Sequence, residues 1–128
     1  MSIPVDLTEL ARVLEQFDYA YLLTTDAECR PHVVAVSAVV EQGHLTIGEV
    51  GRRSLANATA RPQVTVVWPP PDRSDHTLIV DGTCTPAGAA GVRVVPTRAV
   101  LHRPAPPKPV AEGCGSDCIE VLSRPSEG

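Results

Sequence analysis

The first patterned stretch of the chain has apolar residues at helical spacing. They fall on one face of a helix at Leu7, Leu10, Val13, Leu14 and Phe17. Asp6 stands at the N-cap position, and Glu9 follows three residues later, as in a capping box. The pattern therefore predicts an amphipathic helix from about Leu7 to Phe17 that begins at Asp6.

Further along the chain, short runs rich in β-branched residues are bounded by polar, glycine or proline turns. These runs predict strands at 19–25, 31–40, 45–48, 63–68, 76–84 and 91–101. The valines of residues 31–40 occupy both faces, which predicts a strand buried on both sides. In a short chain such a strand needs a second cover, from a barrel interior together with a partner subunit. Pro96 marks an edge or bulge position in the last strand.

A second helix is predicted between the third and fourth strands. It runs from about Arg53 to Ala60 and ends at Arg61-Pro62, because a residue before proline is disfavoured in helical conformation. One helix, three strands, a helix and three strands favour a mainly β protein, a six-stranded antiparallel barrel with flanking helices. A β-sandwich is the alternative architecture.

The composition changes near residue 103. Residues 1–103 carry all the predicted elements and form one domain, whereas residues 104–128 form a proline-rich tail that contains Cys114 and Cys118. A single Cys-x-x-x-Cys lacks the second ligand pair of a closed zinc site, so no metal site is predicted. Whether the tail covers the site, forms a disulfide or is disordered stays open at this stage.

Charge and composition narrow the function. With a net charge of -4 and only 3% aromatic residues, the chain lacks the basic surface and stacking platforms typical of nucleic-acid binding. It has no apolar run of the ~20 residues needed to span a bilayer, nor a signal-peptide pattern at its start. We therefore expect a cytoplasmic protein with reduced thiols that binds neither nucleic acid nor a membrane.

The most informative stretch for chemistry is residues 48–57. Gly48 and Gly51 precede the second helix, and Arg52 and Arg53 stand at its start. A helix N-terminus offers unpaired N–H groups, and arginine adds forked donors suited to phosphate oxygens. The stretch is therefore a candidate anion site, with a tight turn and a solvated charged face as the alternative.

Three pieces of sequence resemble those of the split-barrel flavin-binding proteins related to pyridoxamine 5'-phosphate oxidase, including their deazaflavin-using relatives. The likeness covers most of residues 7–101. The pieces are Thr24-Thr25 with the turn to residues 30–34, Arg52-Arg53-Ser54-Leu55-Ala56-Asn57 with Arg61-Pro62-Gln63-Val64, and Val80-Asp81-Gly82-Thr83. The resemblance implies the split-barrel fold of the FMN-binding type.

The resemblance also implies FMN or F420 as cofactor, in a groove between the subunits of a homodimer. By position, Arg52 would hold the phosphate and Asn57 would hold the helix against a neighbouring strand, and Arg53 could supply the cation that is missing at Ser54. Ser54 stands where the family usually has lysine. The remaining residues expected at the cofactor are Val34, Ala35, Val36 and Ser37, which would line the ring with backbone groups, together with Gly48 and Trp68.

In such a site the cofactor supplies the hydride-transfer chemistry, and no side-chain nucleophile is required. The sequence has no Ser-His-Asp arrangement and no nucleotide-binding glycine fingerprint, so no catalytic residue is assigned. His32 and Tyr21 are candidate proton donors, and Trp68 would stack on a ring or fill the core. The expected function is a small FMN- or F420-dependent oxidoreductase. The alternative is a non-catalytic split-barrel protein that binds a ligand for storage or sensing or serves as a dimeric scaffold.

Overall fold

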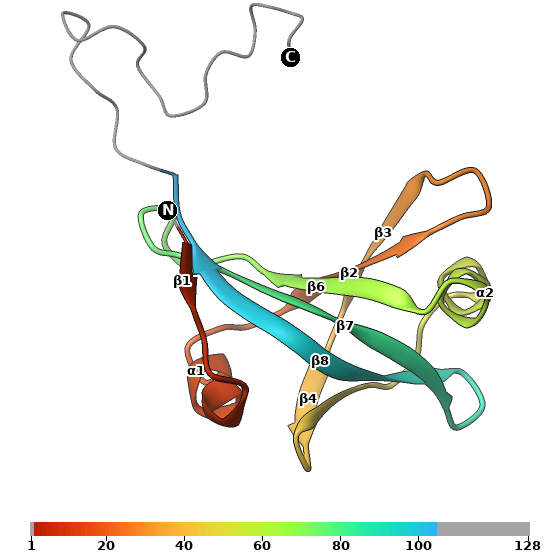
Figure 1. Ribbon diagram of the computed structural model, residues 1–128, viewed down its shortest axis with the longest axis horizontal. Coiled ribbons are helices and arrows are strands. Elements are labelled where there is room, and N and C mark those ends of the chain that lie inside the picture. The colour runs from red at the N-terminus through yellow and green to blue at the C-terminus, as the bar shows by residue number, and fades with distance from the viewer. Residues whose placement is uncertain (1, 105–128) are drawn as a thin grey trace, which may run out of the picture.

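The computed structural model describes residues 2–104, which form one antiparallel sheet with short helices at its margins (Figure 1). The helical segments are η1 (Leu7–Glu9), α1 (Leu10–Leu14) and α2 (Arg52–Ala60). The eight strands are β1 (Ser2–Pro4), β2 (Ala20–Thr25), β3 (Pro31–Val36), β4 (Ala38–Glu41), β5 (His44–Ile47), β6 (Gln63–Trp68), β7 (Thr77–Ala87) and β8 (Gly91–His102).

The order of strands explains why the sheet curls. Seven strands are hydrogen-bonded in the order β3-β2-β6-β7-β8-β5-β4, and β1 pairs with β8. The end strands β3 and β4 are joined in the chain by Ser37 alone. A single-residue link spans only about 7 Å between its neighbours, so the two ends of the sheet must come close together. The predicted antiparallel split barrel is confirmed.

The number of strands differs from the prediction at two places. The expected strand 31–40 breaks at Ser37, because β3 pairs with β2 whereas β4 pairs with β5. The expectation that it is buried on both sides is wrong for the single chain, since Val33 is 51% exposed and Val39 is 59% exposed. The strand β1 was not predicted, and its pairing with β8 adds an eighth strand.

The core is built from alternate residues of the strands, which are buried. In β2 and β6 the alternation is strict, and in β7 it holds over residues 77–84; Leu22, Val66 and Val80 have no exposed surface. Leu10 and Val13 of α1 close one end of this core. Cys84 is also buried, and burial raises the pKa of its thiol from 9.0 to about 11.

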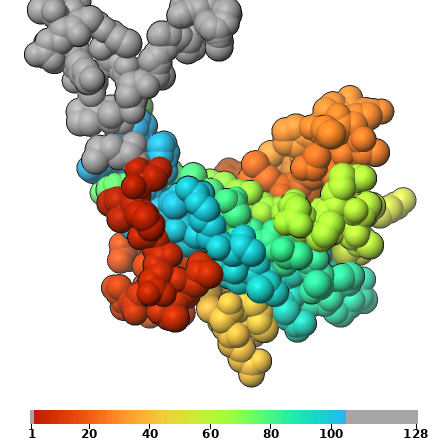
Figure 2. All heavy atoms as spheres, in the orientation of Figure 1, coloured from red at the N-terminus to blue at the C-terminus, as the bar shows by residue number. Residues whose placement is uncertain are grey.

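The predicted irregularity at Pro96 is present. The β7–β8 ladder shifts register between Asp81, which faces Arg98, and Gly82, which faces Pro96. The extra residue is Thr97, whose hydroxyl donates a hydrogen bond to the carbonyl of Asp81 at 3.2 Å. Two hairpins also project from the body, β2–β3 in orange and β4–β5 in yellow (Figure 2).

The N-terminal helix is shorter and tighter than predicted. It begins as a 3₁₀ turn and continues as α-helix only to Leu14. Asp6 caps it as expected, because its carboxylate accepts hydrogen bonds from the backbone and the hydroxyl of Thr8, and these bonds lower the pKa of Asp6. The side chain of Glu9 pairs with Arg12 at 2.7 Å rather than completing a capping box.

The predicted tail, with Cys114 and Cys118, lies outside the described residues. Within residues 2–104, none of the helices has the length and apolar character required to cross a membrane. The same part of the chain contains no group of three or more histidine, cysteine or acidic side chains placed to hold a metal ion.

Candidate functional site

A groove of about 480 Å³ opens where the sheet is split. It lies where β3 passes into β4 and where β5 ends. Its lining residues are Tyr19, Ala35, Val36, Ser37, Gly48 and Glu49. The structure thus brings together four residues that were predicted to lie at one cofactor, although the chain separates Ser37 from Gly48 by ten residues. Val34 is different, because it is half-buried and packs against the core.

The first turn of α2 follows directly from the groove wall. Gly51 is the N-cap residue and makes no side-chain capping bond, so the first N–H groups of α2 have no side-chain acceptor there. Arg52 and Arg53 are exposed, and neither makes an ion pair within residues 2–104. Only Val50 and Gly51 lie between Glu49 and Arg52 in the chain, so the Cα atoms of Glu49 and Arg52 are at most about 11 Å apart. A ligand in the groove could therefore extend an anionic group to the arginines.

Two other predicted residues of α2 lie on its buried face. Asn57 is 5% exposed, and its side-chain amide donates a hydrogen bond to the hydroxyl of Thr24 in β2 at 3.1 Å. This contact is the role expected for Asn57, which was to hold the helix against a neighbouring strand. Ser54 is 1% exposed, and its hydroxyl is buried without a hydrogen-bond partner. Ser54 therefore faces the interior and does not contribute a donor to the exposed surface of the first turn.

The end of α2 is fixed by the same neighbouring strand. The guanidinium of Arg61 donates a hydrogen bond to the carbonyl of Thr25 at 2.9 Å. The carbonyl of Pro62 accepts one from the backbone N–H of Cys84 in β7 at 2.8 Å. Arg61 and Pro62, which belong to the sequence pieces that resemble the split-barrel family, therefore attach the end of α2 to β2 and β7. Neither residue lines the groove.

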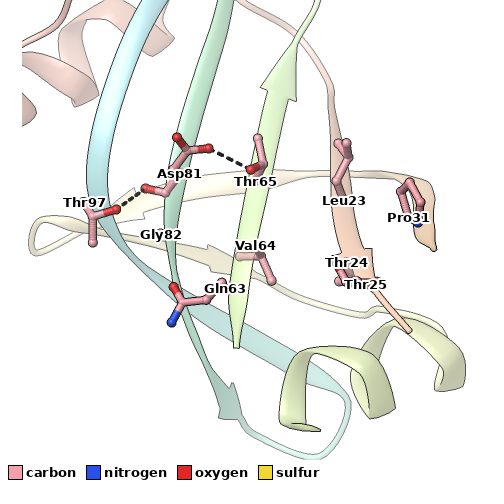
Figure 3. Close-up of a pocket in the computed structure, with 10 residues that line it drawn as sticks. All are labelled: Leu23, Thr24, Thr25, Pro31, Gln63, Val64, Thr65, Asp81, Gly82 and Thr97. Carbon is pink, nitrogen blue, oxygen red and sulfur yellow. Dashed lines mark hydrogen bonds between the residues drawn. The ribbon is translucent and has the colours of Figure 1, made fainter. Parts of the chain in front are cut away.

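A second hollow, of about 320 Å³, lies over β2, β6, β7 and β8 (Figure 3). The hydroxyl of Thr65 donates a hydrogen bond to the carboxylate of Asp81 at 2.7 Å, and the guanidinium of Arg98 lies 3.5 Å from its other oxygen. Thr97 is bonded to the carbonyl of Asp81. Because these polar groups already have partners within the fold, the groove at the split is the stronger candidate for a ligand site.

Trp68 does not lie where a ring-stacking residue should. It ends β6 with only 1% of its surface exposed and belongs to the hydrophobic core. A side chain so enclosed cannot offer a face to a ligand in the open groove. The prediction that Trp68 contacts the cofactor is therefore wrong, and its alternative, a core plug, describes the structure.

Tyr19 is a groove residue that the sequence did not single out. It is 47% exposed, and its ring meets that of Tyr21 edge to face at 5.5 Å between centroids. Hydrogen bonding with Tyr21 raises the pKa of Tyr19. Neither of the predicted proton donors, Tyr21 and His32, lines the groove. One sequence feature could have identified Tyr19 as a candidate site residue. Aromatic residues make up only 3% of the chain, and Tyr19 stands next to the start of a strand.

The groove residue Gly48 lies against Gly91, the first residue of β8. A side chain at Gly91 would collide with the carbonyl oxygen of Gly48, and its Cβ would lie 2.8 Å from the carbonyl oxygens of Ile47 and Ala87. Real Cβ atoms do not approach backbone oxygens this closely. The chain end of β5, which forms part of the groove, therefore rests directly on the start of β8.

Solved structures with this fold are found among cofactor-binding proteins. A FAD-binding protein of Mesorhizobium loti aligns with a TM-score of 0.63 at 14% identity, covering 79% of this chain and 95% of that one. The FAD-binding protein of Mycobacterium smegmatis aligns at 0.59 and 19% identity, covering 80% and 100%. An F420 reductase aligns at 0.57 and 20% identity, covering 71% and 94%. The fold is therefore the split barrel that the sequence pieces indicated.

The sequence itself places the chain more narrowly. The uncharacterized proteins Mb0449c of Mycobacterium bovis and MT0457 of Mycobacterium tuberculosis are each 39% identical to it over 138 aligned positions. The alignments cover 94% of this chain and 96% of each relative. The chain belongs to the same family as these two mycobacterial proteins. No protein-family model matches it.

Proposed function

We propose that the protein is a small oxidoreductase that binds FMN or F420 in the groove and transfers a hydride to an organic substrate. The observation that carries the proposal is the junction of the groove with the first turn of α2. Gly48 and Glu49 line the groove, and Arg52 and Arg53 follow within the same short segment. A flat ring with a phosphate on a flexible arm has the matching shape and charge.

The dimensions and chemistry of the site support this ligand class. Small-molecule sites usually measure about 300–1,000 Å³, and the groove has about 480 Å³. β3 pairs only with β2, so the backbone groups along its other edge are not used by the sheet. Those N–H and C=O groups suit the polar edge of a flavin or deazaflavin ring. The uncapped helix start and the two guanidinium groups suit a phosphate.

Each part of the chain then has a defined task. Arg52 and Arg53 bind the phosphate, and the backbone from Ala35 to Ser37 orients the ring. Tyr19 provides an aromatic wall on which a ring or a substrate can pack. The cofactor supplies the hydride chemistry when it is bound, and the protein supplies binding, orientation and electrostatics.

The names of the structurally similar proteins support the same class. Two of them are FAD-binding proteins and one is an F420 reductase.

We extend the proposal to a homodimer in which the second subunit covers the groove. Its support is the exposure of Tyr19 and Val33, apolar or aromatic side chains that lie along β3 and the groove.

The direct test is a titration of the purified full chain with FMN and with F420, followed by absorbance and fluorescence. We expect saturable binding of one of them with a perturbed ring spectrum, and oxidation of the bound reduced cofactor by an added organic acceptor. A protein that binds neither contradicts the proposal.

Binding without turnover of any acceptor would indicate the second candidate, a non-catalytic protein that stores or senses the cofactor. The observation that favours it is Ser54. The side chain at this position is buried and uncharged, whereas lysine is usual in the resembling family.

A further inference from the structure

The groove contains one charged side chain that the proposed function does not use. Glu49 lies in the wall, beside Gly48 and in the same lining as Tyr19. Its carboxylate makes no ion pair within residues 2–104. By contrast, the carboxylate of Asp81 in the second hollow is held by Thr65 and Arg98. Glu49 is thus a negative charge that the fold presents to the groove without a partner.

We infer that Glu49 lowers the reduction potential of the ring that binds in this groove. The inference rests on the proposed function, because it concerns the redox state of the cofactor assigned there. It goes beyond that function by giving a specific side chain control over how strongly reducing the bound cofactor is.

The nearby arginines do not cancel this charge once the cofactor is bound. FMN carries a phosphate monoester with about −1.5 to −2 charges at neutral pH, which nearly balances two guanidinium groups. Arg52 and Arg53 would therefore be neutralised by the phosphate that they hold. Glu49 precedes them in the chain and lines the groove, so its charge acts on the ring end.

The direction of the effect follows from electrostatics. Reduction of a flavin adds electron density around its ring nitrogens, and charge placed near those atoms tunes the potential. A neighbouring carboxylate repels the electron-rich reduced ring more than the oxidised ring. A bound ring would also displace water from the groove and so strengthen the interaction. The protein should therefore bind the oxidised cofactor better than the reduced cofactor, relative to a protein without this charge.

The test compares Glu49→Gln with Glu28→Gln in the full chain with FMN, or with F420 if FMN does not bind. Both variants remove one negative charge, but Glu28 is exposed in the β2–β3 turn, where it pairs with Arg30. The measurement is the ratio of dissociation constants for oxidised and reduced cofactor, together with the midpoint potential against a reference dye.

We expect Glu49→Gln to shift the affinity ratio about tenfold toward the reduced cofactor. For a two-electron couple this corresponds to a rise of about 30 mV in potential. Glu28→Gln should match the wild type. Glu49→Asp, which keeps the charge, should restore most of the wild-type ratio and so separate a charge effect from a change in packing.

An unchanged potential in Glu49→Gln would overturn the inference and leave the proposed function intact. A potential that changes equally in Glu49→Gln and Glu28→Gln would also overturn it, because the effect would then come from net charge. If the wild type binds neither FMN nor F420, the proposed function fails and the inference fails with it.

Discussion

The two sides of α2 are built in opposite ways. On the buried side, the amide of Asn57 is bonded to Thr24, and Ser54 is enclosed. On the exposed side, Arg52 and Arg53 project from the first turn with no ion pair among the described residues. The difference separates two tasks within nine residues: one face fixes the helix in the fold, and the other keeps its charge available for a ligand.

The same contrast holds for the two hollows. In the hollow over β6 and β7, Asp81 is held by Thr65 and by Arg98. In the groove at the split, Glu49 has no such partner in residues 2–104. Partnered polar groups stabilise the fold, whereas an unpartnered charge next to a groove is available to act on a ligand that binds there.

The largest predicted effect is on the stability of the fold, and it concerns the buried residue Trp68. Because it is 1% exposed, Trp68→Ala should lower the free energy of unfolding by about 3–5 kcal/mol, as measured by urea denaturation. Trp68→Phe retains most of the buried volume and should still fold. Its affinity for FMN or F420 should equal that of the wild type. A folded Trp68→Phe protein with clearly weaker cofactor binding would contradict the conclusion that Trp68 does not contact the cofactor.

The next effect concerns the exposed side of α2. The double variant Arg52→Ala/Arg53→Ala should bind the phosphate-bearing cofactor at least about 100-fold more weakly, because it removes two charge-assisted hydrogen bonds of about 1.5–3 kcal/mol each. Its unfolding transition should match that of the wild type, since both side chains are exposed. Arg73→Ala, an exposed arginine in the β6–β7 loop, is the matched control. If the double variant binds the cofactor as tightly as the wild type, the phosphate does not bind at the first turn of α2.

The smallest effect concerns the buried side of the same helix. Asn57→Ala removes the bond to Thr24 and leaves a buried hydroxyl unsatisfied, which should cost about 1–3 kcal/mol in the free energy of unfolding. Thr59→Ala, an exposed change on the same helix, should stay within about 0.5 kcal/mol of the wild type. Similar losses in both variants would mean that the Asn57 contact does not anchor α2.

Local patterns in the sequence were sufficient for most of the fold. The strand at residues 63–68 agrees with the prediction at both ends, and α2 begins one residue before its predicted start. These boundaries were predictable from nearby proline and glycine residues, because the effects of proline and glycine on backbone geometry are local. The irregularity at Pro96 was predictable for the same reason.

The errors fall where tertiary contacts decide. The valines of residues 31–40 look continuous, yet Ser37 divides them because the two halves pair with strands at opposite ends of the sheet. β1 is only three residues long, too short for a periodic pattern, and exists through its ladder with β8. Trp68 was predicted at the cofactor but is buried in the core, whereas Tyr19 was not singled out but lines the groove. The face on which an aromatic residue lies depends on tertiary packing and not on its neighbours in sequence.

Gly91 gives this scaffold a constraint for protein engineering. Its missing side chain leaves room for the carbonyl of Gly48, so a methyl group at position 91 would displace a residue that lines the groove. A library designed to change which compounds the scaffold accepts should therefore keep glycine at position 91 and vary the wall at Tyr19 and Glu49. Randomising the hairpin tip would deform the cavity before any new specificity could be selected.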